Sequence, residues 1–308
     1  MEPASRNDNM VIVGTNWSSG AASVRERRVS EQSSRLEPLV GLRLAYRAGA
    51  DSPRHCLGHV PFRRASGDYV DCTNRPEPGS RKCASCAIVD ATFASNLHHA
   101  HTRGQAELDP AVLEHLAQPN VLYVAAFRDL SVKVGTSTEV RAHKRLAEQG
   151  AWRAVLVARA DDGVSVRRIE DAVTELLDVP QSVSMTRKLE GMVRPRRDDA
   201  IEARLDQLAG DVVELVGRSG DPALVGTRTR WSFPGSDDDL WSNLHPYPLK
   251  LESGAHDIEV LAACGRLVVI GRPGADDRFV ADLGRLYGIE LDIGDHRPDA
   301  LAVQDSLF

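Results

Sequence analysis

Four cysteines, Cys56, Cys72, Cys83 and Cys86, are the residues whose type and spacing point most directly to chemistry. Two residues separate Cys83 from Cys86, so this pair can present both thiolates to one tetrahedral ion. Cys56 and Cys72 can complete the ligand set from the Gly- and Pro-containing segment that precedes the pair. Because a closed set of four sulfur ligands is typical of structural zinc, the sequence predicts a zinc site that stabilises its segment.

Two alternatives to this assignment stay open. His55 and His59 bracket Cys56 and are possible substitute ligands. The four cysteines could also be reduced, buried residues of an irregular segment, since nothing in a chain without a signal peptide favours disulfides. Cys264 stands alone in an apolar region, where we expect a small buried thiol.

Three histidines, His98, His99 and His101, follow the cysteines. Their spacing fits neither one face of a helix nor a zinc-finger motif. We therefore expect a solvated segment that links the zinc module to the next domain.

A second group of reactive residues falls in residues 121–150. Apolar runs at 121–124 and 132–134 flank a polar corner, which predicts two strands joined by a tight turn, the second strand ending at Gly135. A helical pattern follows from Ser137 or Thr138, with a hydroxyl as its cap. Tyr123 and Lys133 are then expected at one end of a small sheet.

An anion site is expected where the second strand meets this helix. Gly135, Thr136 and Ser137 would offer backbone donors near the helix amino end. Arg141 and Arg145 are spaced i and i+4 and would share one helix face above the turn. Such a cluster suits a phosphate group.

The order of these residues resembles the core of the GIY-YIG nuclease superfamily. There, the first motif ends in a tyrosine, the second ends in a glycine on the paired strand, and an arginine follows on a helix. Here the motifs are Val121-Leu122-Tyr123 and Lys133-Val134-Gly135, so lysine replaces the second tyrosine.

A closer resemblance is to a family labelled domain of unknown function 2797, over roughly residues 40–295. That family combines a Lys-Val-Gly second motif with an upstream cysteine module. It also has an arginine followed by an Asp/Glu-Gln-Gly-Ala run, which residues 145–151, RLAEQGA, match.

The superfamily resemblance implies a role for each residue. Tyr123 would polarise or deprotonate an attacking water, and Arg141 or Arg145 would stabilise phosphoryl charge. Glu170, in a predicted helix from Ser165 to Leu177, would hold a divalent Mg²⁺ or Mn²⁺. Lys133 could act as a general base in place of the second tyrosine if burial or neighbouring cations lowered its pKa. From position alone, Glu170 could instead form an ordinary i, i+3 pair with Arg167.

The predicted fold is α+β or α/β. Residues 1–36 are expected to be a flexible tail, 37–110 a zinc-binding module, 111–197 a β-β-α-β-α core with GIY-YIG-like order, and 198–308 an acidic α+β lobe. The core's third strand is expected at 153–159. In the lobe, we expect a helix at 201–208, strands at 212–216, 258–261 and 267–271, and a helix at 277–287.

Charge is distributed unevenly along the chain, which has a net charge of −6. Residues 121–197 carry 14 Lys+Arg against 10 Asp+Glu, and residues 198–308 carry 10 against 21. The basic segment 186–197 includes Lys188, a candidate substrate-binding residue. We therefore expect nucleic-acid contact, to RNA or DNA, to be confined to the middle of the chain.

Three functions are compatible with these residues. The first is a metal-dependent phosphodiesterase that acts on nucleic acid. The second is a non-catalytic, zinc-stabilised module that binds RNA or DNA, with the acidic lobe limiting nonspecific binding. The third is the same fold redirected to a nucleotide or another small acidic metabolite. Because no signal segment and no run of 18 apolar residues occurs, a cytoplasmic location is expected.

Overall fold

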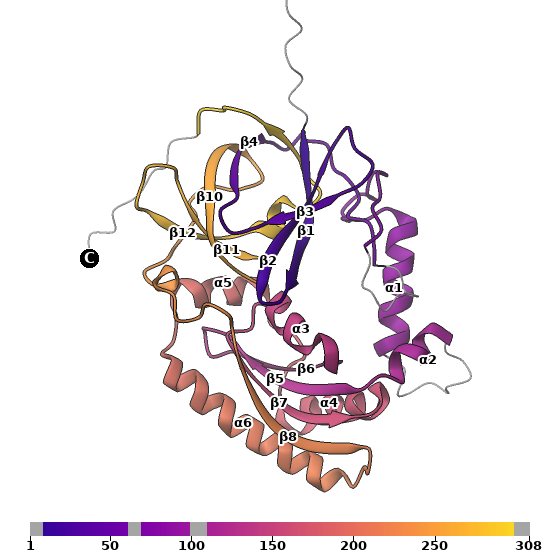
Figure 1. Cartoon of the computed structure of the whole chain (residues 1–308). Coiled ribbons are helices and arrows are strands. Elements are labelled where there is room, and N and C mark those ends of the chain that lie inside the picture. The colour runs from indigo at the N-terminus through magenta and orange to yellow at the C-terminus, as the bar shows by residue number, and fades with distance from the viewer. Residues whose placement is uncertain (1–8, 61–68, 99–109, 299–308) are drawn as a thin grey trace, which may run out of the picture. The chain divides into compact units, whose positions relative to one another are not determined.

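The computed structural model describes residues 9–60, 69–98 and 110–298 of a mixed α+β protein (Figure 1). The chain forms two compact units. Unit 1 comprises Met1–His59, Tyr69–Ala87 and Asp239–Phe308, and unit 2 comprises Val60–Asp68 and Ile88–Asp238. The division falls within the first helix, α1 (Ala84–His98). None of the described helices combines the length and the apolar character that a membrane crossing requires.

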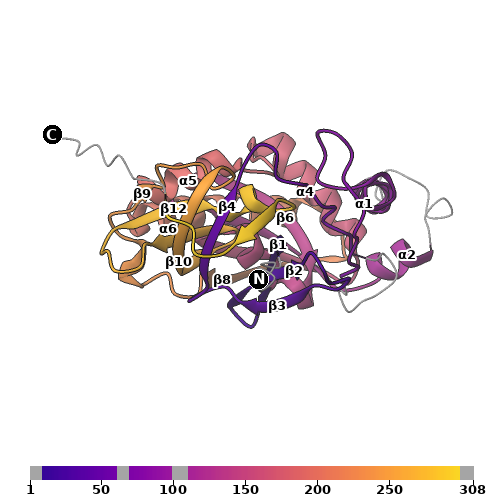
Figure 2. The same cartoon turned by 90° about the horizontal axis from the view of Figure 1, so that it is seen from above.

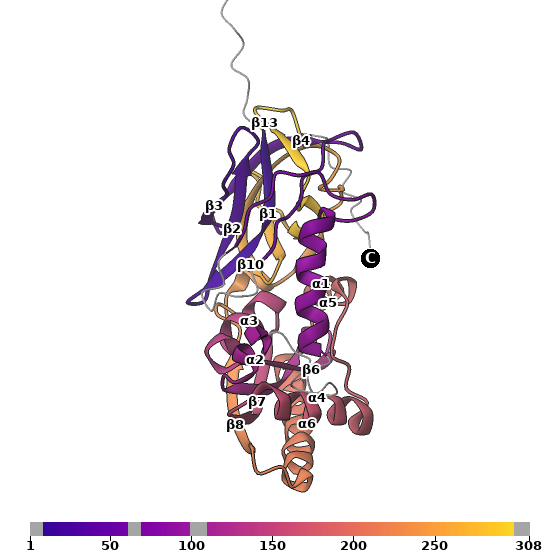
Figure 3. The same cartoon turned by 90° about the vertical axis from the view of Figure 1, so that its right-hand side faces the viewer.

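Unit 1 is built on a nine-stranded sheet in the order β3-β2-β1-β13-β4-β10-β11-β12-β9. Figures 2 and 3 label several of these strands from two further sides. Its strands are β1 (Met10–Ser18), β2 (Ala21–Arg28), β3 (Arg35–Pro38), β4 (Arg43–Ala48), β9 (His245–Pro246), β10 (Gly254–Cys264), β11 (Leu267–Gly271), β12 (Arg278–Asp282) and β13 (Glu290–Ile293). Neighbouring strands are antiparallel, except that β12 and β9 are parallel. Two ends of the sequence thus contribute to one sheet.

The expectation of a flexible tail at residues 1–36 was wrong from residue 9 onward. β1 and β2 form a hairpin, and the register pairs Met10 with Leu291 of β13. Val11 and Ile12 are fully buried. Part of the apolar surface that offsets the ordering cost of this segment is thus supplied by β13, some 280 residues away in sequence, which an interpretation of local composition does not detect.

Unit 2 is built on a four-stranded antiparallel sheet in the order β6-β5-β7-β8. Its elements are α2 (Pro110–Leu116), β5 (Asn120–Ala126), β6 (Val132–Thr138), α3 (Ala142–Gln149), β7 (Arg153–Ala160), α4 (Gly163–Leu177), α5 (Met185–Val193), α6 (Asp198–Ser219) and β8 (Leu224–Ser232). Every residue of β5 is buried, and α4 and α6 both pack on the sheet and on each other. The predicted strands at 121–124 and 153–159 and the helix at 165–177 are confirmed.

The helix that follows β6 begins later than predicted. β6 does not end at Gly135 but continues to Thr138, paired with Asn120. A 3-10 turn, Glu139–Arg141, comes next, and α3 begins only at Ala142. Thr138 makes no side-chain capping hydrogen bond. Thr136 and Ser137 are consequently strand residues, and they do not form the helix amino end proposed for anion binding.

For two elements in the acidic C-terminal part, the predicted type of secondary structure was wrong. The helix at 201–208 and the strands at 258–261 and 267–271 are confirmed. Residues 212–216, predicted as a strand, continue α6, because Val212 and Val216 extend the buried stripe of Ile201, Leu205 and Leu208 at helical spacing. Residues 277–287, predicted as a helix, form β12, which pairs with β11, and a 3-10 turn at Leu283–Leu286.

Residues 198–308 do not form a separate lobe. α6 and β8 belong to unit 2, whereas β9 to β13 belong to unit 1 together with the cysteine segment. The histidine segment cannot be assigned, since His99 and His101 lie outside the described residues and only the backbone of His98 is described, at the end of α1.

Candidate functional site

The four cysteines lie together in unit 1, and we call them the cysteine cluster. Their Sγ atoms are all within 4.8 Å of one another, and those of Cys72 and Cys83 are 3.8 Å apart. A tetrahedral ion with metal–sulfur bonds of about 2.3 Å separates its ligands by about 3.8 Å. The cluster therefore has the dimensions of a four-sulfur site and could bind a metal such as zinc.

Two backbone N–H groups donate hydrogen bonds to the sulfur of Cys56. The N–H groups of Gly58 and Cys83 donate to this Sγ at 3.4 and 3.2 Å. Cys56 is fully buried, and its own N–H donates to the carbonyl of Asn74 at 2.9 Å. Hydrogen bonds to its sulfur and from its own N–H thus fix the position of Cys56 in the cluster.

The two histidines near Cys56 differ in their contacts. Nε2 of His55 lies 2.8 Å from the Glu290 carboxylate, so this ring is engaged outside the cluster. Nδ1 of His59 lies 3.3 Å from Sγ of Cys86. At that position the ring can donate a hydrogen bond to a sulfur ligand.

Three cysteines of the cluster differ in the direction in which the pKa of the thiol is shifted. The Ser85 hydroxyl and the Cys86 backbone N–H lower the pKa of the Cys83 thiol to about 5. Burial, by contrast, raises the pKa of the Cys72 and Cys86 thiols. Four thiolates this close repel one another, so complete ionisation requires a cation among them.

A buried arginine joins this segment to the sheet of unit 1. Arg27 on β2 is 2% exposed, and its Nη1 donates to the carbonyl oxygen of Cys72 at 2.8 Å. This positive charge lies beside a group that would be dianionic with four thiolates and one divalent ion. Nothing in the local sequence around Arg27 predicts this contact.

A second group of ionisable residues lies in unit 2. In the register of β5 and β6, Tyr123 is opposite Gly135, and Ala125 is opposite Lys133. Because paired residues share a face of the sheet, Tyr123, Lys133 and Gly135 project to the same side. A methyl group on Gly135 would overlap the ring and hydroxyl of Tyr123. The glycine therefore makes the space in which the tyrosine ring lies.

Helix α3 brings Gln149 and Arg145 to this tyrosine. Nε2 of Gln149 donates to the Tyr123 hydroxyl at 2.8 Å. Burial raises the pKa of Tyr123, while the charge of Arg145 and the Gln149 hydrogen bond oppose that rise. Gly150, at a φ of 67°, ends α3 directly after Gln149. The Gln-Gly-Ala run thus contains both the hydrogen-bond donor to the tyrosine and the glycine that ends the helix. This run was the sequence signal that could have identified Gln149.

Lys133 is a buried amine with an altered titration. Its exposed fraction is 8%, and its Nζ lies 5.9 Å from the centre of the Tyr123 ring. Burial, together with the charges of Arg145 and Lys188, lowers the pKa of Lys133 to about 8, against the opposing charge of Glu170. A substantial neutral fraction near pH 8 makes this amine able to accept a proton.

Glu170 reaches the same region from α4 with 6% exposure. Its Oε2 lies 3.4 Å from the Thr136 hydroxyl and 3.5 Å from Nη1 of Arg167. Asp162 caps α4 by accepting from the N–H groups of Val164 and Ser165. The i, i+3 pair anticipated from position is thus present, and the carboxylate also acts electrostatically on Tyr123 and Lys133.

Tyr123, Lys133, Arg145, Gln149 and Glu170 are together called the Tyr123 centre. It straddles an edge of the sheet. Thr136 projects to the opposite face from Lys133 and Gly135, because successive strand residues alternate. β6 is the edge strand, and the charge of Glu170 acts on Tyr123 and Lys133 from the other face of the sheet.

Two other candidate residues, Arg141 and Lys188, have contacts of their own. Arg141 pairs with Glu148 at 3.5 Å, and about half of its side chain is exposed. Nζ of Lys188 donates to the carbonyl of Gln149 at 2.8 Å and lies 4.5 Å from the Phe127 ring centre. Lys188 therefore supports the end of α3.

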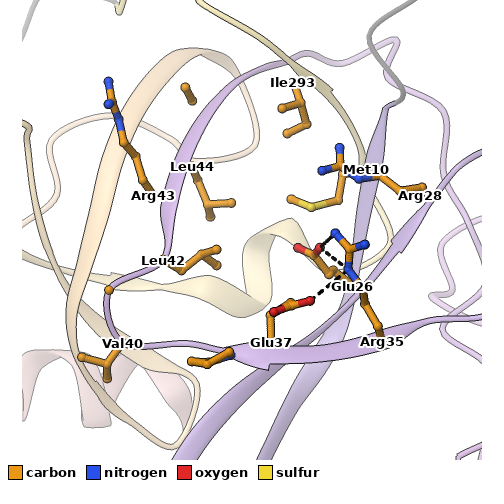
Figure 4. Close-up of a pocket in the computed structure, with 13 residues that line it drawn as sticks. Met10, Glu26, Arg28, Arg35, Glu37, Val40, Leu42, Arg43, Leu44 and Ile293 are labelled. Carbon is orange, nitrogen blue, oxygen red and sulfur yellow. Dashed lines mark hydrogen bonds and ion pairs between the residues drawn. The ribbon is translucent and has the colours of Figure 1, made fainter.

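Unit 1 also contains a cavity of about 510 Å³ between β2, β3 and β4 (Figure 4). Arg35 lies between two carboxylates, 2.8 Å from Glu26 and 3.1 Å from Glu37. Arg43, also on the wall, pairs with Asp257 at 2.7 Å. These charges are compensated by their neighbours, and no sequence motif indicated the cavity.

A family model described as "Protein of unknown function (DUF2797)" matches residues 70–235, more than half of the chain. The chain belongs to this family. The DUF2797 match includes Cys72, Cys83 and Cys86 and the whole Tyr123 centre, whereas Cys56 precedes it. No curated protein and no solved structure matches the chain.

Proposed function

We propose that the Tyr123 centre binds a phosphodiester of a nucleic acid and, with a divalent metal, hydrolyses it. The observation that supports this most is the meeting of a tyrosine hydroxyl, a low-pKa lysine, an arginine and a buried carboxylate at one sheet edge. Basic groups suit a phosphate, and the carboxylate suits a hard cation.

Each side chain has a role in this proposal. Arg145 binds the phosphoryl oxygens and stabilises the charge that develops on them. Tyr123 orients the attacking water through its hydroxyl, which Gln149 fixes in place. Lys133 accepts the proton in its neutral form. The order of motifs resembles the GIY-YIG core, with lysine at the second tyrosine position.

Glu170 is the proposed protein ligand for Mg²⁺ or Mn²⁺, with water and phosphate oxygens as the other ligands. The contacts of this carboxylate with Thr136 and Arg167, at 3.4 and 3.5 Å, are long enough to exchange for a metal. When bound, the metal would supply charge stabilisation at the phosphoryl group.

The experiment that tests this is a cleavage assay on plasmid, single strands and transfer RNA with Mg²⁺ or Mn²⁺. Glu170→Gln is expected to reduce turnover by at least about 100-fold, equivalent to about 3 kcal/mol, while binding stays within about twofold. Glu175→Gln is the matched control, because Glu175 is an exposed carboxylate on the same helix. Full activity of the Glu170→Gln variant would contradict the metal role.

A second candidate function is a binding module without catalysis. Arg167 favours it, because this guanidinium partly neutralises the carboxylate that would have to hold a metal. In that case the wild type binds nucleic acid but cleaves no substrate under either metal. Glu170→Gln would then leave binding unchanged.

We also propose that the cysteine cluster binds one structural Zn²⁺. The 3.8 Å separation of two sulfurs and the N–H donors on Cys56 support this. The ion would tie residues 56–59 and 69–86 together within unit 1, where the described residues of these two stretches provide few core side chains.

A further inference from the structure

Unit 2 contains a cavity of about 450 Å³, and the residues that line it differ in charge from those of the cavity in unit 1. We call it the hairpin cavity. The β5–β6 hairpin, the loop before α5, and one residue each of α5 and α6 line it. Its lining residues are Leu130, Ser131, Val132, Pro180, Ser182, Val183, Ser184, Arg187 and Arg204.

Two guanidinium groups face this cavity. Nε of Arg187 donates to Oδ2 of Asp129 at 3.2 Å, which fixes the guanidinium and leaves both terminal nitrogens for another acceptor. Arg204 on α6 is exposed, and within the described parts of the chain it makes no hydrogen bond or ion pair. The cavity thus has uncompensated positive charge.

Hydroxyl groups add donors to the same lining. Ser184 accepts from the N–H of Arg187 as the cap of α5, so its own hydrogen remains available to a ligand. Ser182 is also in the lining. Guanidinium and hydroxyl donors without competing free carboxylates form an environment for a phosphate. The Asp129 carboxylate is already engaged by Ser131 and Arg187.

The hairpin cavity and the Tyr123 centre share β6. Val132 lines the cavity, and Thr136, which contacts Glu170, lies four residues further along the same face. At about 3.3 Å per residue this separation is about 13 Å. A stacked nucleic-acid strand advances about 3.4 Å per nucleotide, so one strand reaches from the cavity to the Glu170 side of the Tyr123 centre within about four nucleotides.

We propose that the hairpin cavity is a subsite for a backbone phosphate of the nucleic acid whose scissile phosphodiester lies at the Tyr123 centre. The inference rests on the proposed function and defines its substrate class. The substrate is a polynucleotide of several residues, because a mononucleotide or another small acidic metabolite cannot occupy both positions.

The test compares ligands of two lengths, a labelled single strand of about 16 nucleotides and a labelled dinucleotide, by anisotropy at about 50 to 200 mM salt. Arg204→Gln and Arg204→Glu are the variants. Arg218→Gln is the matched control, because Arg218 is an exposed arginine on the same helix outside the cavity. Circular dichroism verifies folding, and the measurement needs no cleavage.

Loss of one phosphate contact to a single strand reduces the slope of log affinity against log salt by about 0.7. Arg204→Gln is expected to show this reduction and to weaken the long strand by about fivefold at low salt, with a larger loss for Arg204→Glu. Dinucleotide affinity and Arg218→Gln are expected to stay at wild-type values.

Three outcomes overturn the inference and are distinguishable. Equal slopes for wild type and Arg204→Gln, with the wild type still cleaving nucleic acid, would remove the subsite and leave the proposed function intact. A wild type that binds neither ligand would remove both. Equal losses in Arg204→Gln and Arg218→Gln would indicate general surface charge instead of a subsite.

Discussion

In the cysteine cluster of unit 1, four residues of one type converge, and backbone N–H groups and the Arg27 guanidinium lie around them. In the Tyr123 centre of unit 2, every ionisable residue is of a different type, and their charges alter one another's titration. The cluster has the chemistry of a closed site that holds a metal and supports a fold. The Tyr123 centre keeps groups that can bind an anion and transfer a proton.

The two sites differ in how burial changes the pKa of their ionisable groups and in what opposes that change. In the cluster, burial opposes ionisation of Cys72 and Cys86, and a bound cation reverses that effect. In the centre, burial lowers the pKa of Lys133 without a compensating partner strong enough to restore it. A site that tolerates an unfavourable charge at a cost in stability is a candidate for function.

The largest expected effect is that of removing two of the four sulfur ligands from the cysteine cluster. The double variant Cys83→Ser/Cys86→Ser should lose its zinc, from about one ion per chain to nearly none, and should melt at least about 10 °C lower. The reason is that structural zinc contributes on the order of 10 kcal/mol to folding in small sites. Elemental analysis and thermal unfolding measure the two effects.

Cys264→Ser is the control, because Cys264 is a buried cysteine outside the cluster. It should keep its metal and lose only modest stability. Equal metal content in the double variant and the wild type would contradict the zinc proposal.

The sequence predicted residue types and local elements better than partners distant in the chain. The spacing of Cys83 and Cys86 identified the cluster, and the run at 121–124 identified the central strand. Strand β1 was missed, since its partner β13 lies at the other end of the sequence. Arg27 was missed because its contact with Cys72 exists only once separate elements pack, whereas the Gln-Gly-Ala run was a signal for Gln149 that was not used.

Arg141 and Arg145 illustrate how one boundary changes a site. The predicted helix start near residue 137 would have put both on one helix face. Because β6 pairs with β5 as far as Thr138, Arg141 falls in the 3-10 turn, and only Arg145 lies within α3. Local periodicity does not encode how far an edge strand pairs with its neighbour. Here that pairing leaves only Arg145 within α3.

The second largest effect is expected from that pair of arginines. Arg145→Gln should lower turnover on nucleic acid by about 100- to 1000-fold, because a charge-stabilising donor is lost where phosphoryl charge develops. Arg141→Gln should stay within about twofold, since Arg141 forms an exposed pair with Glu148. Steady-state cleavage rates measure both effects. Similar losses of turnover in the two variants would contradict a specific role for Arg145 in stabilising phosphoryl charge.

A third effect, on stability, should come from Gly135→Ala. The added methyl group overlaps the ring of Tyr123, which is 1% exposed and cannot move aside, so we expect a loss of about 2–3 kcal/mol. Urea denaturation measures it. Gly210→Ala in α6 is the control, because a methyl group there meets no atom within 4 Å, and alanine is expected to stabilise this helix slightly. Unchanged stability in Gly135→Ala would mean that the tyrosine ring does not depend on the glycine.

The smallest effect is the pH dependence that Lys133 gives to stability. The folded-state pKa of this lysine, about 8, lies below its ordinary value of 10.5. Below pH 8 the amine is protonated in both states, and the folded protein bears the full cost of a buried charge. Between about pH 8 and 10.5 the unfolded chain binds a proton that the folded chain has released, so the stability of the wild type rises with pH.

Lys133→Met removes this titration while keeping a side chain of similar length. At pH 7 it should raise the free energy of unfolding by about 1–2 kcal/mol, less than the pKa shift alone implies, because contact of the amine with the Tyr123 ring is lost as well. The gain should fade as pH approaches 10.5, and nucleic-acid cleavage should be lost at every pH. Lys144→Met on α3, where the lysine is 37% exposed, should show no such trend. A pH-independent difference between Lys133→Met and wild type would mean that the amine is solvated in the folded protein, and the Tyr123 centre would then lose the proton acceptor that sets it apart from the cysteine cluster.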